Sequence, residues 1–156
     1  MKGVRRRVVR EKVVQALYAQ EISGDSVEHV IKCHLTTLEN KAEAFKFAKL
    51  LVMTTVEHHE AIDRIIKAKV ANWDFSRIAI LDRLILRMAI CELLYFKEIP
   101  PKVSMDEAIE LGKLFSTEKS GQFINGVLDA VLQDLKTSGD LTKEGRGLWE
   151  GRSSAQ

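Results

Sequence analysis

Apolar residues recur at three- and four-residue spacing along nearly the whole chain, and strict apolar–polar alternation is absent. The first spacing places apolar side chains on one face of an α-helix, whereas alternation would indicate a half-buried strand. The pattern predicts an all-α fold, a bundle of about six to seven helices. Six of them are expected at residues 4–22, 26–38, 41–70, 77–97, 104–115 and 120–135.

Local signals place the ends of these helices. Ser23-Gly24-Asp25 is expected to end the first helix, and Ser26 to cap the second. The long third helix is expected to kink or break around His58-His59-Glu60. Pro100-Pro101 ends the fourth helix, and Ser104 with Glu107 three residues later fits a capping box for the fifth.

Two segments stand out in this pattern. The helix at 77–97 is apolar almost all round, which predicts that it lies at the centre of its domain. Gly126 falls inside the last helix, where glycine costs about 1 kcal/mol relative to alanine. We therefore expect another helix to approach closely at Gly126.

Length and composition fit one soluble domain. The 156 residues suit a single core, and no apolar run reaches the roughly 20 residues of a membrane span. Cys33 and Cys91 lie far apart, which favours reduced thiols in a cytoplasmic protein. We assign residues 1–136 to the helical domain. Residues 137–156 hold four glycines and no periodicity, which predicts a flexible tail.

Positive charge is concentrated at the start of the chain. Within the first twelve residues six lysines and arginines accompany the single acid Glu11, a balance of +5, so the remaining residues sum to −3 in a chain of net charge +2. Arg6, Arg7 and Arg10 have the spacing of one helix face. Cations near a helix N-terminus oppose its dipole, so their presence there suggests an anionic partner. A solvated basic face without a ligand is the alternative.

Several patterns that suggest chemistry are better explained structurally. His59-Glu60-Ala61-Ile62-Asp63 is close to HExxH, but an aspartate replaces the second histidine. Cys33-His34 is an isolated pair, so we expect no metal site and no cofactor. No nucleophile–base motif and no glycine-rich phosphate loop occurs, which argues against an enzyme.

Three aromatic residues leave alternatives open. Phe123 follows a polar, lysine-containing linker, where an exposed ring would suit stacking on an unpaired base, and a core position is as plausible. Phe115 has core spacing from Leu111. Tyr18 fits the core or a partner surface.

Four blocks in order over residues 4–135 resemble the NusB family of bacterial transcription antitermination factors. The first is Arg6-Arg7-x-x-Arg10 followed by Val14-Gln15-Ala16-Leu17-Tyr18. The second is Leu81-Asp82-Arg83 with Ile85-Leu86-Arg87-Met88-Ala89 and Glu92-Leu93. The others are Pro101-x-Val103 with Glu107-Ala108-Ile109-Glu110-Leu111, and Phe123-Ile124-Asn125-Gly126-Val127-Leu128-Asp129.

The resemblance implies two packed helical subbundles and a binding function without catalysis. It implies binding of boxA, a single-stranded RNA element of nascent and especially ribosomal transcripts. The expected partner is NusE, which is also a small-subunit ribosomal protein. Together they would join other Nus factors on RNA polymerase and suppress termination.

The resemblance also assigns roles to residues of this chain. The expected RNA contacts are Arg6, Arg7, Arg10, Lys119, Ser120, Gln122 and Phe123. Tyr18 and Asp82 match positions where the family meets NusE. Arg87 is a weaker candidate, which either faces RNA or pairs with a carboxylate such as Glu92.

Two other functions remain open. The basic face of a homo-oligomeric interaction module, such as a homodimer, could be occluded by acids of a second copy. The RNA-binding domain of a ribosomal RNA methyltransferase also resembles NusB, but this chain has no methyl-donor domain.

Overall fold

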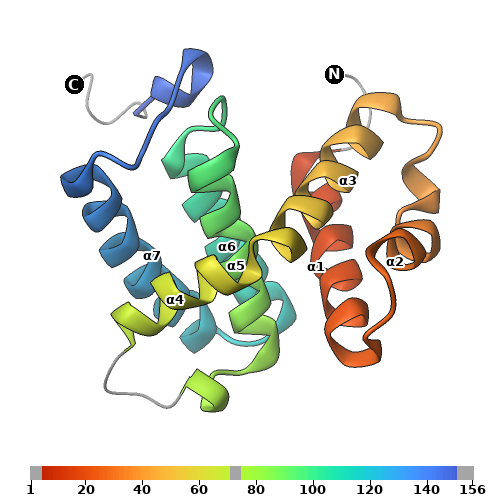
Figure 1. Cartoon of the computed structure of the whole chain (residues 1–156), viewed down its shortest axis with the longest axis horizontal. Coiled ribbons are helices and arrows are strands. Elements are labelled where there is room, and N and C mark those ends of the chain that lie inside the picture. The colour runs from red at the N-terminus through yellow and green to blue at the C-terminus, as the bar shows by residue number, and fades with distance from the viewer. Residues whose placement is uncertain (1–4, 71–74, 151–156) are drawn as a thin grey trace. The chain divides into compact units, whose positions relative to one another are not determined.

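The computed structural model of the chain describes residues 5–70 and 75–150 (Figure 1). These residues form seven α-helices, three short 3-10 helices and no strand, which confirms the all-α prediction. The α-helices are α1 (Arg6–Ser23), α2 (Val27–His34), α3 (Ala42–Glu57), α4 (His59–Lys69), α5 (Ile80–Tyr95), α6 (Pro101–Phe115) and α7 (Glu118–Ser138). The 3-10 helices span Thr36–Leu38, Phe75–Arg77 and Gly145–Leu148. Lys2, which belongs to the basic cluster, and Val4, the predicted start of the first helix, lie outside the described residues.

The chain divides into two compact units, Met1–His59 and Glu60–Gln156. In the first unit α1 packs against α2 and α3. In the second unit α5 packs against α6 and α7, which also pack against each other (Figure 1). Each unit has buried apolar residues of its own. Each candidate site described below consists of residues from one unit.

Most predicted helix ends in the first unit are correct. α1 ends at Ser23 because Gly24 adopts φ +73° and donates its N–H to the Gln20 carbonyl at 2.9 Å. The Ser26 hydroxyl caps α2 by accepting from the His29 N–H at 3.1 Å. The predicted break in the third helix falls at His58, between α3 and α4.

The predicted start of α6 is wrong. Ser104 does not cap this helix, because α6 begins at Pro101 with Pro100 as its N-cap residue. Proline suits the first helical position, where its fixed φ is helical and its missing N–H is not needed. Ser104 is buried inside the helix, and its hydroxyl donates to Oε1 of Glu92 at 2.7 Å.

The prediction that α5 is central to its domain is correct for the second unit. Every residue from 84 to 93 is buried, including the charged side chains of Arg87 and Glu92. Within the described parts of the chain no helix, α5 included, has the length and apolar content to cross a membrane.

The expected close approach at Gly126 is wrong. Gly126 is exposed, and a Cβ built there would meet no atom within 4 Å. The close approach between α6 and α7 lies at Gly112, where a Cβ would come 2.6 Å from Cδ1 of Ile124. It continues at Gly121, where a Cβ would come 3.0 Å from Cγ of Lys113.

The segment after α7 differs from the flexible tail predicted after Lys136. α7 itself continues to Ser138, and residues 143 and 144 then form hydrogen bonds with carbonyl groups at and just after the end of α5. Lys143 Nζ donates to the carbonyls of Glu92 at 3.0 Å and Phe96 at 2.9 Å. Gly147 is buried against the Lys97 carbonyl, which leaves no room for a side chain. Residues 151–156 lie outside the described part.

Candidate functional site

The arginines of α1 differ in their exposure. Arg6 and Arg7 are exposed, whereas Arg10 is only 2% exposed. Arg10 precedes the buried residues Val13, Val14 and Leu17 by three, four and seven positions, so it continues their stripe toward the core. The sequence contains this signal, which conflicts with the expectation that Arg10 shares an exposed face with Arg6 and Arg7. Direct RNA contact by Arg10 stays a prediction, made less favourable by burial.

One aromatic ring lies under two of these arginines. The Cζ atoms of Arg6 and Arg10 lie 3.9 Å and 5.3 Å from the ring centroid of Phe47 in α3, within the range of a cation–π contact. Arg6, Arg10 and Phe47 are called the arginine stack below. Sequence reasoning missed Phe47, because its spacing in α3 is that of an ordinary core residue.

The N-terminus of α1 concentrates positive charge. Arg5 is the N-cap residue and makes no side-chain cap bond, and the first turn contains no acidic residue. The N–H groups of the first turn and the dipole of this end favour an anion, as do the nearby guanidinium groups. The first unit therefore combines three sources of positive potential at one helix end.

A cavity of about 300 Å³ lies in the second unit, between the start of α5 and the start of α7. It is lined by Arg77, Ile78, Ala79, Asp82, Lys119, Ser120 and Phe123. The cavity thus brings together three of the predicted RNA contacts and the predicted partner contact Asp82. Gln122 is exposed and is not among the lining residues. Sequence reasoning did not identify Arg77.

Asp82 is buried in the wall of this cavity. Its side chain accepts a hydrogen bond from the Ser120 hydroxyl at Oδ2, 3.1 Å away. The other oxygen, Oδ1, is buried and has no hydrogen-bond partner among the described residues. Burial raises the pKa of the Asp82 carboxyl, and the Ser120 hydrogen bond partly opposes this by lowering it. The Ser120 hydroxyl donates its hydrogen to Asp82. A direct contact between Ser120 and RNA stays a prediction.

The predicted residues fall in both units. Arg6, Arg7, Arg10 and Tyr18 belong to the first unit, and Asp82, Lys119, Ser120, Gln122 and Phe123 belong to the second. Of the alternatives left open, Tyr18 is 41% exposed and therefore faces outward, and Phe123 is half-buried. Each unit thus presents its own group of candidate contacts.

Arg87 makes an internal ion pair. Its Nε and a terminal nitrogen donate to the two oxygens of Asp63 at 2.7 and 2.8 Å, a bidentate arrangement between α5 and α4. Asp63 is the residue that replaces the second histidine of HExxH, and its carboxylate pairs with Arg87. Arg87 is buried, which favours the predicted pairing with a carboxylate over the predicted contact with RNA.

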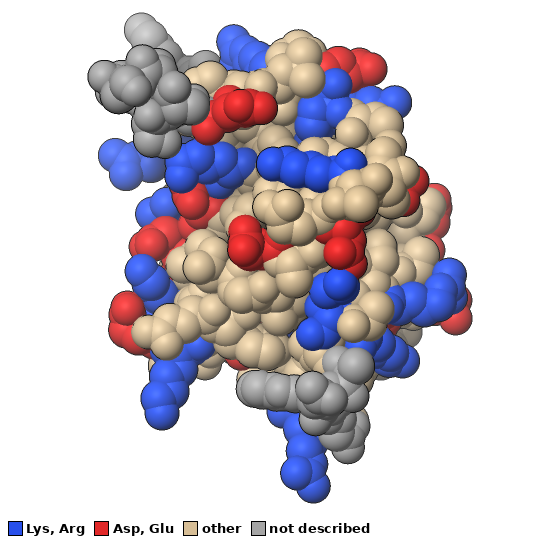
Figure 2. All heavy atoms as spheres, turned by 90° about the vertical axis from the view of Figure 1, so that its left-hand side faces the viewer, with Lys and Arg blue, Asp and Glu red and all other residues tan. Residues whose placement is uncertain are grey.

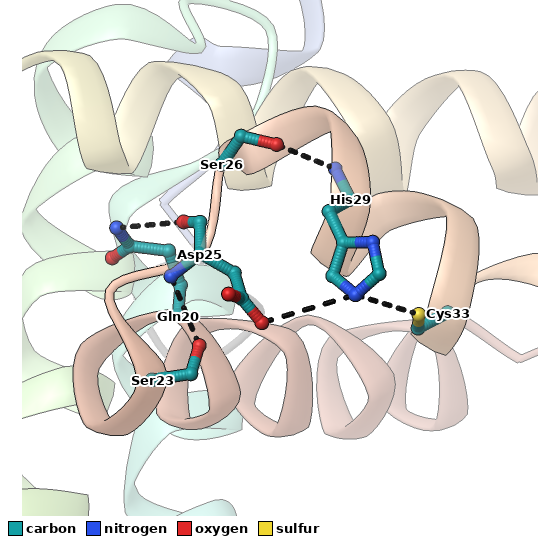
Figure 3. Close-up of polar contacts among 6 residues, drawn as sticks. All are labelled: Gln20, Ser23, Asp25, Ser26, His29 and Cys33. Atoms are coloured by element: carbon teal, nitrogen blue, oxygen red, sulfur yellow. Dashed lines mark hydrogen bonds and ion pairs between the residues drawn. The ribbon is translucent and has the colours of Figure 1, made fainter.

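The polar cluster between α1 and α2 is shown in Figure 3. His29 Nε2 lies 3.5 Å from the Cys33 sulfur and 3.8 Å from Oδ2 of Asp25, so the imidazole near Cys33 belongs to His29. All three side chains are exposed. In the described part of the chain, no group of three or more His, Cys, Asp or Glu side chains is arranged to hold a metal ion.

Charges of both signs are mixed on the face that bears α7. Figure 2 views the molecule from that side, and blue basic side chains lie among red acidic ones on a largely tan surface. Ion pairs of the second unit include Lys102 with Asp106 and Lys113 with Glu110, each at 3.3 Å. Such mixing is typical of a solvated surface, in contrast with the start of α1.

Comparison with known proteins identifies relatives along most of the chain. The sequence model of the NusB family matches residues 7–133. The transcription antitermination protein NusB of Salinibacter ruber is 46% identical over 144 residues, which cover 92% of this chain and 90% of the relative.

Several solved structures are similar to this one. T. maritima NusB has a TM-score of 0.78 and 34% identity, covering 84% of this chain and 92% of that one. The complex of antitermination factors NusB and NusE with double-stranded RNA has a chain with a TM-score of 0.67 and 28% identity, covering 83% and 96%. The match in sequence and fold extends over both units, and the chain therefore belongs to the NusB family of transcription antitermination proteins.

Proposed function

We propose that this chain binds single-stranded boxA RNA in nascent, especially ribosomal, transcripts together with NusE. The resulting complex joins other Nus factors on RNA polymerase and suppresses termination. Family membership supports the antitermination role. The solved complex of a NusB relative with NusE and RNA supports these two classes of partner.

The observation that carries the RNA-binding proposal is the pair of exposed arginines at the start of α1. Arg6 and Arg7 stand at a helix N-terminus without an acidic residue in the first turn. This arrangement is unfavourable for the isolated helix, because cations repel the positive end of its dipole. An RNA phosphate would lower this cost by pairing with the guanidinium groups at the positive end of the helix dipole.

The cavity in the second unit supplies the proposed base contacts. Phe123 is half-buried and lines the cavity with the exposed residue Lys119, so a base stacked on the ring would have its phosphate near a cation. Gln122 is exposed on the same turn of α7 and offers both a donor and an acceptor. Ser120 contributes through Asp82, whose carboxylate it holds at the cavity wall.

NusE is the proposed protein partner. Tyr18 presents an exposed ring and hydroxyl on α1, a residue type that is common in protein interfaces. Asp82 Oδ1 is the second proposed contact, because a donor from NusE that enters the cavity would satisfy this buried oxygen.

The test is equilibrium binding of a fluorescently labelled boxA RNA, alone and with NusE, across a salt series. We expect tighter binding to boxA than to a scrambled RNA, and tighter binding still with NusE. Arg6→Ala and Arg7→Ala should each lower the salt slope by about 0.7, the value for one phosphate contact on a single strand.

Arg64→Ala is the matched control, because Arg64 is an exposed helical arginine outside both candidate groups. It should leave the slope unchanged. Equal affinity for scrambled RNA, or slopes insensitive to both α1 arginines, would contradict the proposal. A homo-oligomer in sedimentation that does not dissociate on adding RNA would instead support the occluded interaction module.

A further inference from the structure

The arginine stack places two guanidinium groups on one ring. Phe47 is 8% exposed, so its ring is fixed by the core of the first unit. Arg6 is exposed, and its Cζ lies 3.9 Å from the ring centroid, well within the range of a cation–π contact. Arg10 shares the ring at 5.3 Å from its buried position. A rigid core residue is therefore in contact with a solvent-exposed arginine of the RNA-binding segment.

This contact changes what Arg6 can do. An exposed arginine samples many rotamers, and fixing one on binding a ligand has an entropic cost. A guanidinium held against a ring has already lost part of this freedom, while its N–H donors lie at the edge of the planar group. The negative face of the ring also lowers the electrostatic cost of two cations lying close together.

We propose that Phe47 is a positioning residue for RNA recognition: its ring holds the Arg6 guanidinium so that the N–H edge meets an RNA phosphate. The buried Arg10 contacts the same ring. This inference rests on the proposed RNA-binding function and assigns a role to a residue of α3 that contacts no RNA itself.

The test compares Phe47→Leu with wild type in boxA RNA binding. Leucine keeps an apolar side chain in the core and removes the ring. We expect binding to weaken about two- to five-fold, the range of a cation–π contact at an exposed site. The salt slope should shift toward that of Arg6→Ala, by up to about 0.7. Phe47→Tyr keeps the ring face and should bind like wild type.

A double-mutant cycle separates positioning from a loss of packing. Phe47→Leu should have no further effect on RNA binding in an Arg6→Ala background, and should remain additive with Arg7→Ala. Phe45→Leu is the matched control, because Phe45 lies on the same helix, is half-buried and is outside the stack. It should leave RNA affinity unchanged.

A fluorinated phenylalanine at position 47 covers the case in which Phe47→Leu does not fold. It preserves the shape of the ring and weakens its negative face, so RNA affinity should fall as fluorination increases. Constant affinity across this series, or the same loss from Phe47→Leu with and without Arg6, overturns the inference alone. RNA binding that ignores both Arg6 and Arg7 overturns the proposed function, and the inference with it.

Discussion

Two glycines of the second unit should respond oppositely to the same substitution. Gly112 lies in α6 against α7, where a Cβ would come 2.6 Å from Cδ1 of the fully buried Ile124. Gly126 lies on the exposed face of α7, with no atom within 4 Å of a Cβ. Replacing each by alanine therefore tests the placement of α6 against α7.

The expected sizes follow from these surroundings. Alanine is better than glycine inside a helix by about 0.8–1.0 kcal/mol, a gain that applies at both positions. At Gly126 this is the whole effect, so Gly126→Ala should be stabilising by about that amount. At Gly112 the gain is offset by overpacking, which costs about 1–3 kcal/mol. Gly112→Ala should therefore be about 1–3 kcal/mol less stable than Gly126→Ala.

Ile124→Val isolates the clash, because it removes the Cδ1 atom. In the wild-type background it should cost about 0.5–1.5 kcal/mol. In the Gly112→Ala background the lost methyl group makes room for the new Cβ, so the double variant should be more stable than the sum of the single effects predicts.

Urea unfolding followed by far-ultraviolet circular dichroism measures all four variants. A change in midpoint at constant m-value reports stability, and about 1 kcal/mol corresponds to roughly 2–4 °C in Tm for a chain of this size. If Gly112→Ala is as stable as Gly126→Ala, or if its effect adds to that of Ile124→Val, the packing of α6 on α7 described above is incorrect.

Further predictions concern the buried polar groups of the second unit. Asp63→Ala removes the carboxylate from the buried Arg87 guanidinium and should cost about 3–5 kcal/mol in urea unfolding, whereas the joint change Asp63→Leu with Arg87→Met should cost much less. Burial lowers the pKa of Lys143 to about 8 from 10.5, partly opposed by Glu92, so the unfolded chain binds more protons between these values. The free energy of unfolding, taken relative to that of Lys143→Met, should therefore rise with pH from about 8 to 10.5. The rise should be less than about 1.4 kcal/mol per pH unit, because the amine is partly exposed. A difference in unfolding free energy that does not change with pH would refute this prediction. Ser120→Ala removes the hydrogen bond that lowers the Asp82 pKa, so a carboxyl NMR titration should show that pKa rising further; an unchanged value would contradict the assigned cause.

Features set by neighbouring residues could be predicted from the sequence. Gly24, Ser26 and the break at His58 follow from local backbone preferences, and the burial of α5 follows from its apolar periodicity. The four ordered motifs identified the family, and membership in a family of transcription antitermination proteins confirms that the chain is not an enzyme.

Features that depend on a distant partner could not be predicted in this way. Ser104 resembles a cap, but its hydroxyl is used by Glu92 on another helix. Gly112 and Gly126 are both glycines inside helices. They differ only in what surrounds them, because Gly112 faces a side chain of the neighbouring helix and Gly126 faces no atom within 4 Å. The segment around Lys143 has no apolar periodicity, and the carbonyl groups that hold it lie about fifty residues earlier, at the end of α5.

The candidate site shows the same division. The sequence indicated the arginines of α1 and the start of α7, but not that Phe47 lies under Arg6 or that Ser120 bonds Asp82. Those contacts join residues far apart in the chain, and periodicity within one helix carries no information about them. The exception is Arg10, whose burial was visible in the stripe that it shares with Val13.

A reconstituted transcription reaction tests the central claim most directly. Read-through of a terminator is measured with RNA polymerase, NusE and the other Nus factors, on templates with an intact or a scrambled boxA. The account predicts that adding this chain raises read-through on the intact template alone, and that Arg6→Ala combined with Arg7→Ala abolishes the increase. Equal read-through on both templates, or full activity of the folded double variant, would contradict it.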